Sequence, residues 1–276
     1  MIHDIDPIAF SIFSIPIYWY GLMYLFGFIS FLCLSKLRLK HSYFQFTKSN
    51  WSMDDAYSIL FYSFLGLIIG GRLLYCLIYN FDYYINNPMS ILDTRDGGMS
   101  FHGALIGIII SLSIYVKRHK KNIIELFDFV TPCVGIGIAF GRLGNFINGE
   151  LYGKPVPTDF KYGVVFPQSG DLLYRHPSQL YQMILEGILL FFILWLFARK
   201  SNKKGQASAL FLILYGIFRI FSEFFREPDP QIGVIMYNLN LGQLLCIPMI
   251  FIGIALYIRF TYYKYQDINE QNNVKV

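Results

Sequence analysis

Seven long apolar runs dominate the sequence, and short charged clusters separate them. A helix needs about 20 predominantly apolar residues to cross a bilayer, and runs of that length are typical of membrane proteins rather than of soluble cores. The pattern therefore predicts an all-α integral membrane protein with seven transmembrane helices. The expected spans are residues 17–35, 56–81, 99–116, 129–147, 181–197, 207–225 and 241–258.

The distribution of Lys and Arg residues tests this count independently. The loops after the first, third and fifth spans, together with the C-terminal tail, carry 15 of the 23 basic residues. Basic residues accumulate in cytoplasmic loops. The alternation predicts an N-terminus outside the cell and a C-terminus in the cytoplasm. Because residues 1–17 contain no Lys or Arg, we expect an uncleaved first span rather than a signal peptide.

Composition limits the partners and cofactors that can be expected. Only 15% of the residues are charged, against about 25% in soluble domains. The net charge of +5 is concentrated in alternate loops, so we expect a lipid bilayer around the chain and no nucleic-acid partner. The four cysteines stand alone without a CxxC spacing, and no nucleotide motif occurs. We therefore expect no metal site and no cofactor.

The chain is expected to form a single polytopic membrane domain, residues 1–276. The longest loop on the outer side, residues 148–180, contains four prolines and a mixed apolar and polar pattern. Such a pattern favours short strands or turns. We interpret this loop as a small extracytoplasmic subdomain between the fourth and fifth spans.

Ionisable residues within the apolar runs give the strongest indication of function. A charge at the bilayer centre costs roughly 3 kcal/mol on insertion scales, so each one requires a partner or a functional role. The basic residues in question are Arg72, Arg142 and Arg219, and the acids within or at the ends of the runs are Asp128, Glu150, Glu186 and Glu223.

Arg142 belongs to a polar, glycine-rich segment, GRLGNFINGELYG, at residues 141–153. On a helix, Arg142 and Asn145 share one face. One interpretation is a hydrogen-bonded lock between helices, because Asn and Arg side chains also join membrane helices. The segment carries more donors than one lock requires, so we favour a ligand site at the outer end of the fourth span.

Three charged residues of the sixth span, Arg219, Glu223 and Arg226, are spaced at i, i+4 and i+7 along one stripe of a helix. They could form a purely structural ladder of ion pairs. Two arginines and one glutamate leave a net positive charge, however, and that charge suits an anionic ligand.

His102 lies between glycines at the outer mouth of the third span, which favours a functional role over a structural one. Arg72 could serve either helix packing or phosphate binding.

Seven of these residues map to the outer half of the predicted membrane, namely His102, Arg142, Asn145, Glu150, Arg219, Glu223 and Arg226. Guanidinium groups bind phosphate with forked pairs of N–H donors. The sequence therefore predicts a cavity in the outer leaflet that binds the phosphate of a lipid.

The chain resembles the prolipoprotein diacylglyceryl transferases. Residues 141–153 agree with the signature of that family, and four further segments occur in the family's order, so that the resemblance covers the chain from the first span to the seventh. These segments are WYGLMY (19–24), GGMSFHG (97–103), HPSQLY (176–181) and YGIFR (215–219), the last followed by EFFREPD (223–229). Ala104 departs from the pattern, which has a second glycine there.

The resemblance implies one reaction. Phosphatidylglycerol donates its diacylglyceryl group to the lipobox cysteine of a prolipoprotein signal peptide, a thioether forms, and glycerol 1-phosphate leaves. The enzyme would lie in the bacterial cytoplasmic (inner) membrane with its active site toward the extracytoplasmic side. The functional positions that the match implies are Tyr20, His102, Arg142, Asn145, Glu150, Gly153, Arg219, Glu223 and Arg226.

A mechanism follows as a hypothesis. Arg142 and Arg219 would bind the phosphate and offset the charge of the departing glycerol phosphate. A cysteine thiol has a pKa of about 8.5, so His102 would act as the base that removes its proton. Glu223 or Glu150 would orient a guanidinium or the headgroup. Tyr20 and Asn145 would hydrogen-bond the headgroup, with Gly153 and Arg226 also assigned to substrate binding.

Other classes of membrane protein fit less well. Transporters tend to contain internal repeats and polar sites at the midplane, and neither is visible here. An intramembrane protease is the second alternative, but the sequence lacks a GxSxG serine turn and an HExxH zinc pair, and no two intramembrane aspartates are placed to act as a dyad. A receptor that only binds the lipid is not separated from an enzyme by residue types, but a transfer assay with a lipobox peptide separates all three.

Overall fold

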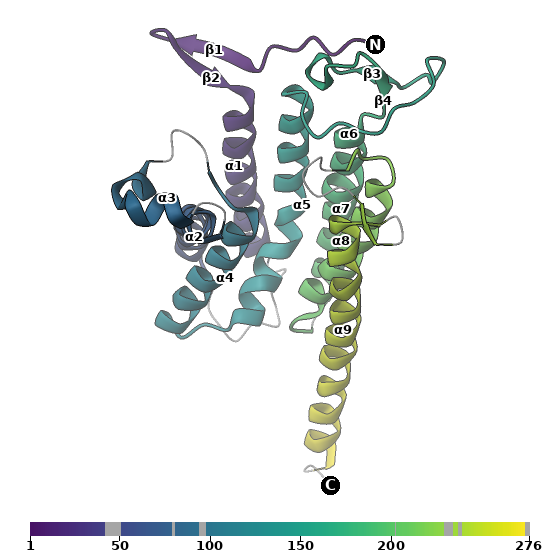
Figure 1. Ribbon diagram of the computed structural model, residues 1–276. Coiled ribbons are helices and arrows are strands. Elements are labelled where there is room, and N and C mark those ends of the chain that lie inside the picture. Colours follow the sequence, from purple (N-terminus) through teal and green to yellow (C-terminus); the bar gives the residue numbers. More distant parts are fainter. Residues whose placement is uncertain are drawn as a thin grey trace. The chain divides into compact units, whose positions relative to one another are not determined.

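The structure is a computed structural model, and it describes residues 1–41, 51–78, 81–93, 98–201, 203–228, 234–236 and 239–273 (Figure 1). Gly97 and Asp229, which belong to two of the segments quoted above, lie outside these ranges. The chain divides into two compact units. One contains Met1–Thr47 and Phe127–Val276, and the other contains Lys48–Leu126.

Long helices make up most of the first unit. The chain contributes α1 (Trp19–Lys40), α5 (Ile123–Ile147), a continuous helix made of α6 (Ser178–Gln182), η3 (Met183–Leu189) and α7 (Leu190–Lys200), then α8 (Gln206–Glu223) and α9 (Leu241–Asn273). The middle part of the continuous helix, η3, is π-helical. Short π-helical stretches are uncommon and often occur at functional sites.

Among the described residues, three small antiparallel hairpins accompany these helices. They are β1 (Ile8–Ile12) with β2 (Ile15–Tyr18), β3 (Val164–Val165) with β4 (Tyr174–Arg175), and β5 (Val234–Met236) with β6 (Leu239–Asn240). A short 3-10 turn, η2 (Pro167–Ser169), lies between β3 and β4. The short strands expected within residues 148–180 correspond to β3 and β4, and each of them is two residues long.

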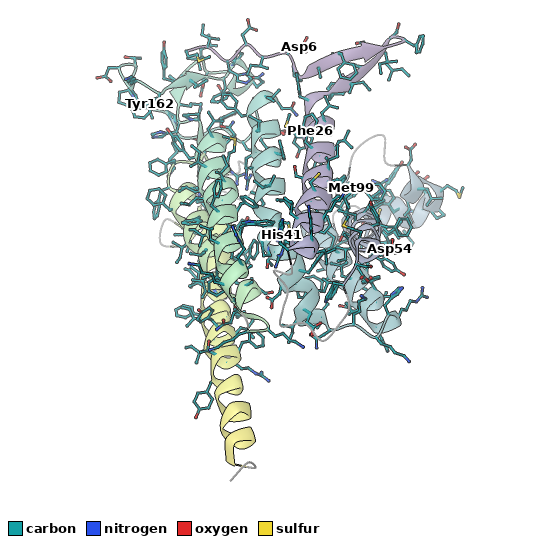
Figure 2. The ribbon with its side chains drawn as sticks, turned by 180° about the vertical axis from the view of Figure 1, so that it is seen from behind. Asp6, Phe26, His41, Asp54, Met99 and Tyr162 are labelled. Atoms are coloured by element: carbon teal, nitrogen blue, oxygen red, sulfur yellow. The ribbon has the colours of Figure 1, made fainter. Side chains whose placement is uncertain are left out.

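The first unit has two distinct ends. The N-terminal segment pairs with β3, since the backbone N–H of His3 donates to the carbonyl of Val165 at 2.8 Å. Asp6 and Tyr162 accordingly lie at one end, whereas His41 lies at the far end of α1 (Figure 2). Helix α5 runs antiparallel to α1, so its last turn reaches the end that carries the strands (Figure 1).

Small residues allow the helices of the first unit to approach closely. A Cβ atom on Gly187 of η3 would lie 2.7 Å from the Cβ of Ala139 on α5, and one on Gly135 would lie 2.7 Å from the carbonyl oxygen of Gly187. Because lipid is as apolar as the side chains, helices in a membrane associate through close van der Waals packing of this kind and not through the hydrophobic effect. These contacts bring α5 and η3 together close to Arg142 on α5 and Glu186 on η3.

The second unit is built on a pair of tightly packed helices, α2 (Met53–Ile78) and α4 (Phe101–Arg118), with α3 (Phe81–Asn86) and η1 (Pro88–Leu92) between them in sequence. Glycines four residues apart face each other, Gly66 and Gly70 on α2 and Gly103 and Gly107 on α4. A Cβ atom on Gly107 would lie 2.0 Å from the carbonyl oxygen of Gly66. This is the small-xxx-small arrangement of membrane helices.

Arg72 in α2 has a structural role in this unit. Its guanidinium donates to the carbonyl oxygens of Ile91 at 2.9 Å, Gly98 at 3.0 Å and Ser90 at 2.8 Å, and to that of Asp93. Of the two roles open to it from sequence, these bonds favour packing over phosphate binding, because they hold the segment before α4 against α2.

Each of the seven apolar runs coincides with a helix over most of its described residues, and the prediction of a helical integral membrane protein is confirmed. Six helical segments among the described residues are long and apolar enough to cross a membrane, namely Trp19–Lys40, Met53–Ile78, Ile123–Ile147, Ser178–Lys200, Gln206–Glu223 and Gly242–Tyr262. Helix α4, which corresponds to the predicted third span, is not one of the six. The count of seven spans therefore stays a prediction.

Candidate active site

Arg142 and Arg219, from two different helices, meet at one buried carboxylate. Nη2 of Arg142 on α5 lies 3.2 Å from Oε2 of Glu186, and Nη1 of Arg219 on α8 lies 3.5 Å from Oε1 of the same side chain. The carboxylate is fully buried, and Ser222 donates its hydroxyl proton to Oε1 at 2.5 Å. A buried carboxylate needs such partners, because removing a charge from water costs several kcal/mol.

The network continues along α8 and past its end. Nη2 of Arg219 lies 3.0 Å from Oε2 of Glu223, and Nη1 of Arg226 lies 3.6 Å from Oε1 of Glu223. Helix α8 ends at Glu223, so Arg226 reaches the carboxylate from the following turn and not, as expected from sequence, from one stripe of a continuous helix. The order of contacts is Arg142, Glu186, Arg219, Glu223 and Arg226. Among the described residues, the three guanidiniums and two carboxylates of this network sum to a net charge of about +1 if all are ionised.

Asn145 and Glu150 form a second polar pair next to this network. The amide Nδ2 of Asn145 donates to Oε1 of Glu150 at 2.8 Å. Gly149 makes the turn between them with φ at +67°, a conformation that glycine adopts without strain. Gln179 of α6 donates to the carbonyl oxygen of Glu150 at 2.7 Å and so fixes this turn against the next helix.

Tyr20 lies beside the same part of α5. A Cβ atom on Gly144 would lie 2.8 Å from the Tyr20 ring, so the glycine allows the ring to approach the helix one residue before Asn145. The hydroxyl groups of Tyr20 and Tyr24 are 3.3 Å apart.

Gly153 joins three segments of the outer loops. Its N–H donates to the carbonyl oxygen of His176 at 2.9 Å, its own carbonyl accepts from Arg175 at 3.1 Å, and it forms an antiparallel bridge with Arg226. A Cβ atom at this position would lie 2.4 Å from the His176 carbonyl oxygen and 2.6 Å from that of Phe225. Only glycine fits this junction without displacing its neighbours.

Charged groups of the outer loop stabilise the junction. Arg175 forms ion pairs with Asp171 and, at 3.1 Å, with Glu227. Its guanidinium holds the pKa of the exposed Asp171 carboxyl well below the usual range. Burial, and secondarily the positive charge of Lys154, lowers the pKa of the neighbouring His176. A lowered pKa keeps this imidazole neutral at pH 7.

A cavity of about 300 Å³ opens beside these loops. It is lined by residues of the glycine-rich segment and of the turn after α8, namely Asn148, Gly149, Glu150, Leu151, Tyr152, Gln168, Arg226, Glu227 and Pro228. Its volume is at the lower limit of small-molecule sites. Glu150 and Arg226, both predicted from sequence to bind substrate, share its wall.

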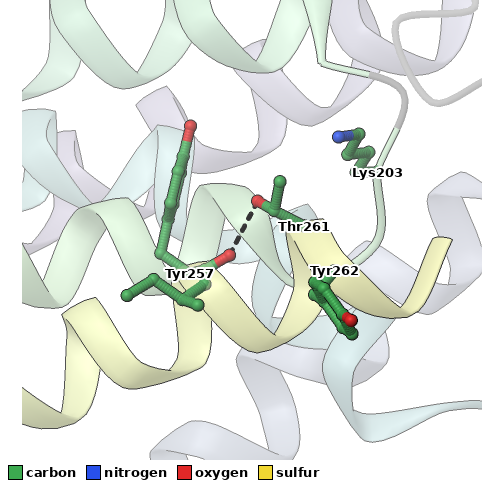
Figure 3. A pocket seen from close by; sticks show the side chains of 5 residues that line it. Lys203, Tyr257, Thr261 and Tyr262 are labelled. Carbon is green, nitrogen blue, oxygen red and sulfur yellow. Dashed lines mark hydrogen bonds between the residues drawn. The ribbon is translucent and has the colours of Figure 1, made fainter. Parts of the chain in front are cut away.

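Another cavity, of about 330 Å³, lies on the C-terminal half of α9 (Figure 3). Lys203, Tyr257, Ile258, Thr261 and Tyr262 line it, and Thr261 donates its hydroxyl proton to the carbonyl oxygen of Tyr257 at 2.8 Å. None of the residues predicted to form the site contributes to this cavity.

The structure therefore brings Arg142, Arg219, Glu223 and Arg226 into one network and pairs Asn145 with Glu150. The ring of Tyr20, on α1, lies against Gly144, the residue before Asn145. His102 belongs to the second unit, where it is exposed in the first turn of α4 behind the N-cap Ser100. Its role in the site stays a prediction.

Comparisons with known proteins identify the family. The family model of prolipoprotein diacylglyceryl transferase matches residues 7–259. The chain belongs to the prolipoprotein diacylglyceryl transferase family. It is 47% identical over 261 residues to the phosphatidylglycerol–prolipoprotein diacylglyceryl transferase of Polaromonas naphthalenivorans, covering 94% of this chain and 96% of that protein. Proteins of the same name from Paracidovorax citrulli and Methylibium petroleiphilum are 46% and 45% identical, each over 94% of this chain and 96% or 97% of the relative.

Two residues at the centre of the arginine network, Glu186 and Ser222, received no role from sequence. Glu186 was visible only as one acid in a long apolar run, and Ser222 carried no signal at all. The partners of Glu186 lie 44 and 33 residues away, so no local spacing connects them. The only indication in the sequence was that an ionised glutamate within a membrane span is energetically costly, so Glu186 was expected to have a basic partner on another helix.

Proposed function

We propose that the chain transfers the diacylglyceryl group of phosphatidylglycerol to the lipobox cysteine of prolipoproteins, the first step of bacterial lipoprotein maturation. The cysteine sulfur forms a bond to the glyceryl carbon that carries the phosphate ester. The bond between that carbon and the phosphate oxygen breaks, and its electron pair leaves with glycerol 1-phosphate. The thiol proton passes to a base. Family membership over 94% of the chain supports the reaction class.

The meeting of Arg142 and Arg219 at one carboxylate is the observation that carries the proposal. These arginines belong to separate helices, and the described part of their network contains one guanidinium more than it contains carboxylates. An excess positive charge in a membrane protein suits the phosphate of an anionic lipid. Both guanidiniums would also offset the second negative charge that develops as the phosphomonoester departs.

Other assignments in the proposal concern the headgroup. Asn145 and Tyr20 would hydrogen-bond it, Glu150 and Arg226 would act from the wall of the 300 Å³ cavity, and Glu223 would orient the two guanidiniums that flank it. Gly153 would contribute by holding the outer loops together around this region. These roles combine the geometry of the first unit with the family motifs.

The proposed membrane topology places the site on the extracytoplasmic side. We infer seven spans, with α4 as the third, an external N-terminus and a cytoplasmic C-terminus, from the distribution of basic residues. The chain would form one polytopic domain of the cytoplasmic (inner) membrane, with residues 148–180 as an extracytoplasmic subdomain and the site on that side.

One assay tests the proposed function directly. The purified protein is incubated with phosphatidylglycerol vesicles and a peptide that contains a lipobox cysteine, and the peptide is analysed by mass spectrometry. We expect a mass increase of one diacylglyceryl group in a bond that resists hydroxylamine, and release of glycerol 1-phosphate. A peptide with serine in place of cysteine is the control. Lipid binding without a heavier peptide would support a receptor or a transporter instead.

Replacing His102 with glutamine tests the proposed base. General-base catalysis contributes about 10²- to 10⁴-fold, so we expect His102→Gln to lower kcat by about 100-fold at pH 7. The rate of the variant should rise with pH until the thiol itself ionises, near pH 8.5. The measurement is the pH profile of kcat for both proteins. An unchanged rate and profile would remove His102 from proton transfer. His176→Gln is the matched control, because that imidazole packs against the rings of Phe160, Tyr181 and Phe225, and its pH profile should match that of the original protein.

A further inference from the structure

Glu186 lies at the point where the two arginines of the site meet. Its side chain is fully buried in the π-helical segment η3, and it has three partners, Arg142, Arg219 and Ser222. We propose that Glu186 is a positioning residue, which sets the distance and orientation of Arg142 and Arg219 so that both address one lipid phosphate. This inference rests on the proposed function and extends it.

Each oxygen of the Glu186 carboxylate contacts a different arginine. Oε2 contacts Nη2 of Arg142 at 3.2 Å, and Oε1 contacts Nη1 of Arg219 at 3.5 Å. The two guanidiniums therefore take their separation from one rigid, planar group. Carboxylates and phosphates both accept forked N–H donors. Arginines that are spaced to contact the two oxygens of one carboxylate are therefore also spaced to contact two oxygens of one phosphate.

The contacts with Glu186 do not exhaust the donors of the arginines. A guanidinium carries five N–H donors. Among the described residues, the guanidinium of Arg142 donates only to Glu186, through Nη2, and Arg219 uses Nη1 for Glu186 and Nη2 for Glu223. Both guanidiniums can thus keep their contact with Glu186 while other N–H groups bind a phosphate.

The packing around Glu186 restricts its own movement. The next residue, Gly187, is in close contact with Ala139 on α5, and Ser222 on α8 donates its hydroxyl to Oε1. The carboxylate is thereby fixed between the helices that carry the two arginines. A misplacement of about 1 Å in a catalytic group can cost about 100-fold in rate, so such fixation has kinetic consequences.

A glutamine at position 186 separates positioning from a structural role. The amide keeps the size of the side chain, but its nitrogen presents N–H donors to a guanidinium, which has only donors. One of the two arginine contacts is therefore lost. We expect Glu186→Gln to lower kcat by about 100-fold. The KM for phosphatidylglycerol should stay the same or fall, because a negative charge near the phosphate has been removed.

Conservative variants and a matched control sharpen this test. Glu186→Asp keeps the charge but shortens the side chain by one methylene, which draws the carboxylate away from the arginines, so it should also lower kcat by about 100-fold. Asp128→Asn is the control, because Asp128 is equally buried in the same unit and accepts hydrogen bonds from Ser208, away from the arginines. It should lower thermal stability and leave kcat per folded molecule within about threefold of the original protein.

The outcomes are distinguishable. If Glu186→Gln retains kcat within about threefold of the original protein, or if its loss appears only in stability as for Asp128→Asn, the positioning role is wrong. If the glutamine variant does not fold, Ser222→Ala decides, because it removes one hydrogen bond to Oε1 and should lower kcat about tenfold at constant KM. An unchanged kcat in Ser222→Ala would overturn the proposal. If the unmodified protein itself transfers no diacylglyceryl group, the proposed function fails instead.

Discussion

Arg142→Ala and Arg219→Ala are each expected to lower diacylglyceryl transfer by about 10³-fold or more. Loss of one group that stabilises developing charge costs about 10²- to 10³-fold, and loss of an arginine that stabilises a transferring phosphate costs up to about 10⁵-fold. The reaction here creates a phosphomonoester, whose additional charge both guanidiniums would face. Initial rates with phosphatidylglycerol vesicles and a lipobox peptide measure the effect.

The double variant adds information that neither single variant supplies. Both arginines contact Glu186, and residues that share a partner are usually not additive. We expect Arg142→Ala/Arg219→Ala to be hardly slower than the worse single variant. A product of the two single effects would mean that the arginines act independently, and it would contradict a shared phosphate site.

Folding controls are necessary because each alanine variant also leaves a buried carboxylate with one partner fewer. Breaking a buried ion pair costs about 3–5 kcal/mol. Arg219→Lys keeps the charge but not the forked donors, and should still lose at least about 10-fold in rate. Arg38→Ala is the matched control. Arg38 is buried in the same unit and donates to the carbonyl oxygens of Asp128 and Phe129, at the opposite end of α5. Full activity in either Arg142→Ala or Arg219→Ala would remove that residue from phosphate binding.

Arg38 also shows where sequence analysis of charge is limited. The sequence placed it in a basic cytoplasmic loop, and it does occupy the last turn of α1. The structure buries its guanidinium against α5. Hydropathy and loop charge predict which residues lie near a membrane surface, but they contain no information about which helix end packs against which.

The arginines of the site illustrate the opposite case. A charge within an apolar run is costly wherever the helix packs, so Arg142 and Arg219 could be identified from sequence alone. Their common partner could not be identified, since it depends on the pairing of α5 and α8 with η3. The irregular winding of η3 was equally invisible, because the run 181–197 has the composition of an ordinary apolar helix.

Short strands in the loops were only partly predictable. The prolines and mixed pattern of residues 148–180 indicated turns or short strands, and two strands of two residues occur there. The pairing of the N-terminal residues with β3 could not be foreseen, because it joins segments more than 160 residues apart. Backbone pairing of this kind follows from tertiary packing and leaves little trace in composition.

Gly153→Ala is expected to lower activity by about 100-fold or more, although it adds only one methyl group. The resemblance to the family assigned Gly153 to substrate binding, whereas its geometry indicates a junction. The added Cβ would lie 2.4 Å from the His176 carbonyl oxygen and 2.6 Å from the Phe225 carbonyl oxygen. Both are backbone atoms, which cannot rotate away, so the bridge between Gly153 and Arg226 must open. Overpacking of this kind costs about 1–3 kcal/mol and would displace Arg226 from Glu223.

Two measurements decide between a junction and a direct contact with substrate. If Gly153 acts as a junction, Gly153→Ala should lose activity and also become more sensitive to proteolysis within residues 154–175, because the hydrogen bonds from Gly153 to His176 and from Lys154 to Phe225 are lost together. Gly141→Ala, in the same glycine-rich segment, is the matched control. A Cβ atom there meets nothing within 4 Å, and alanine favours a helix over glycine by about 1 kcal/mol, so its activity should be retained. If Gly153→Ala loses activity while the outer loop remains as resistant to proteolysis as before, Gly153 contacts the substrate directly. The junction would then accommodate the added methyl group, and the bound substrate would not.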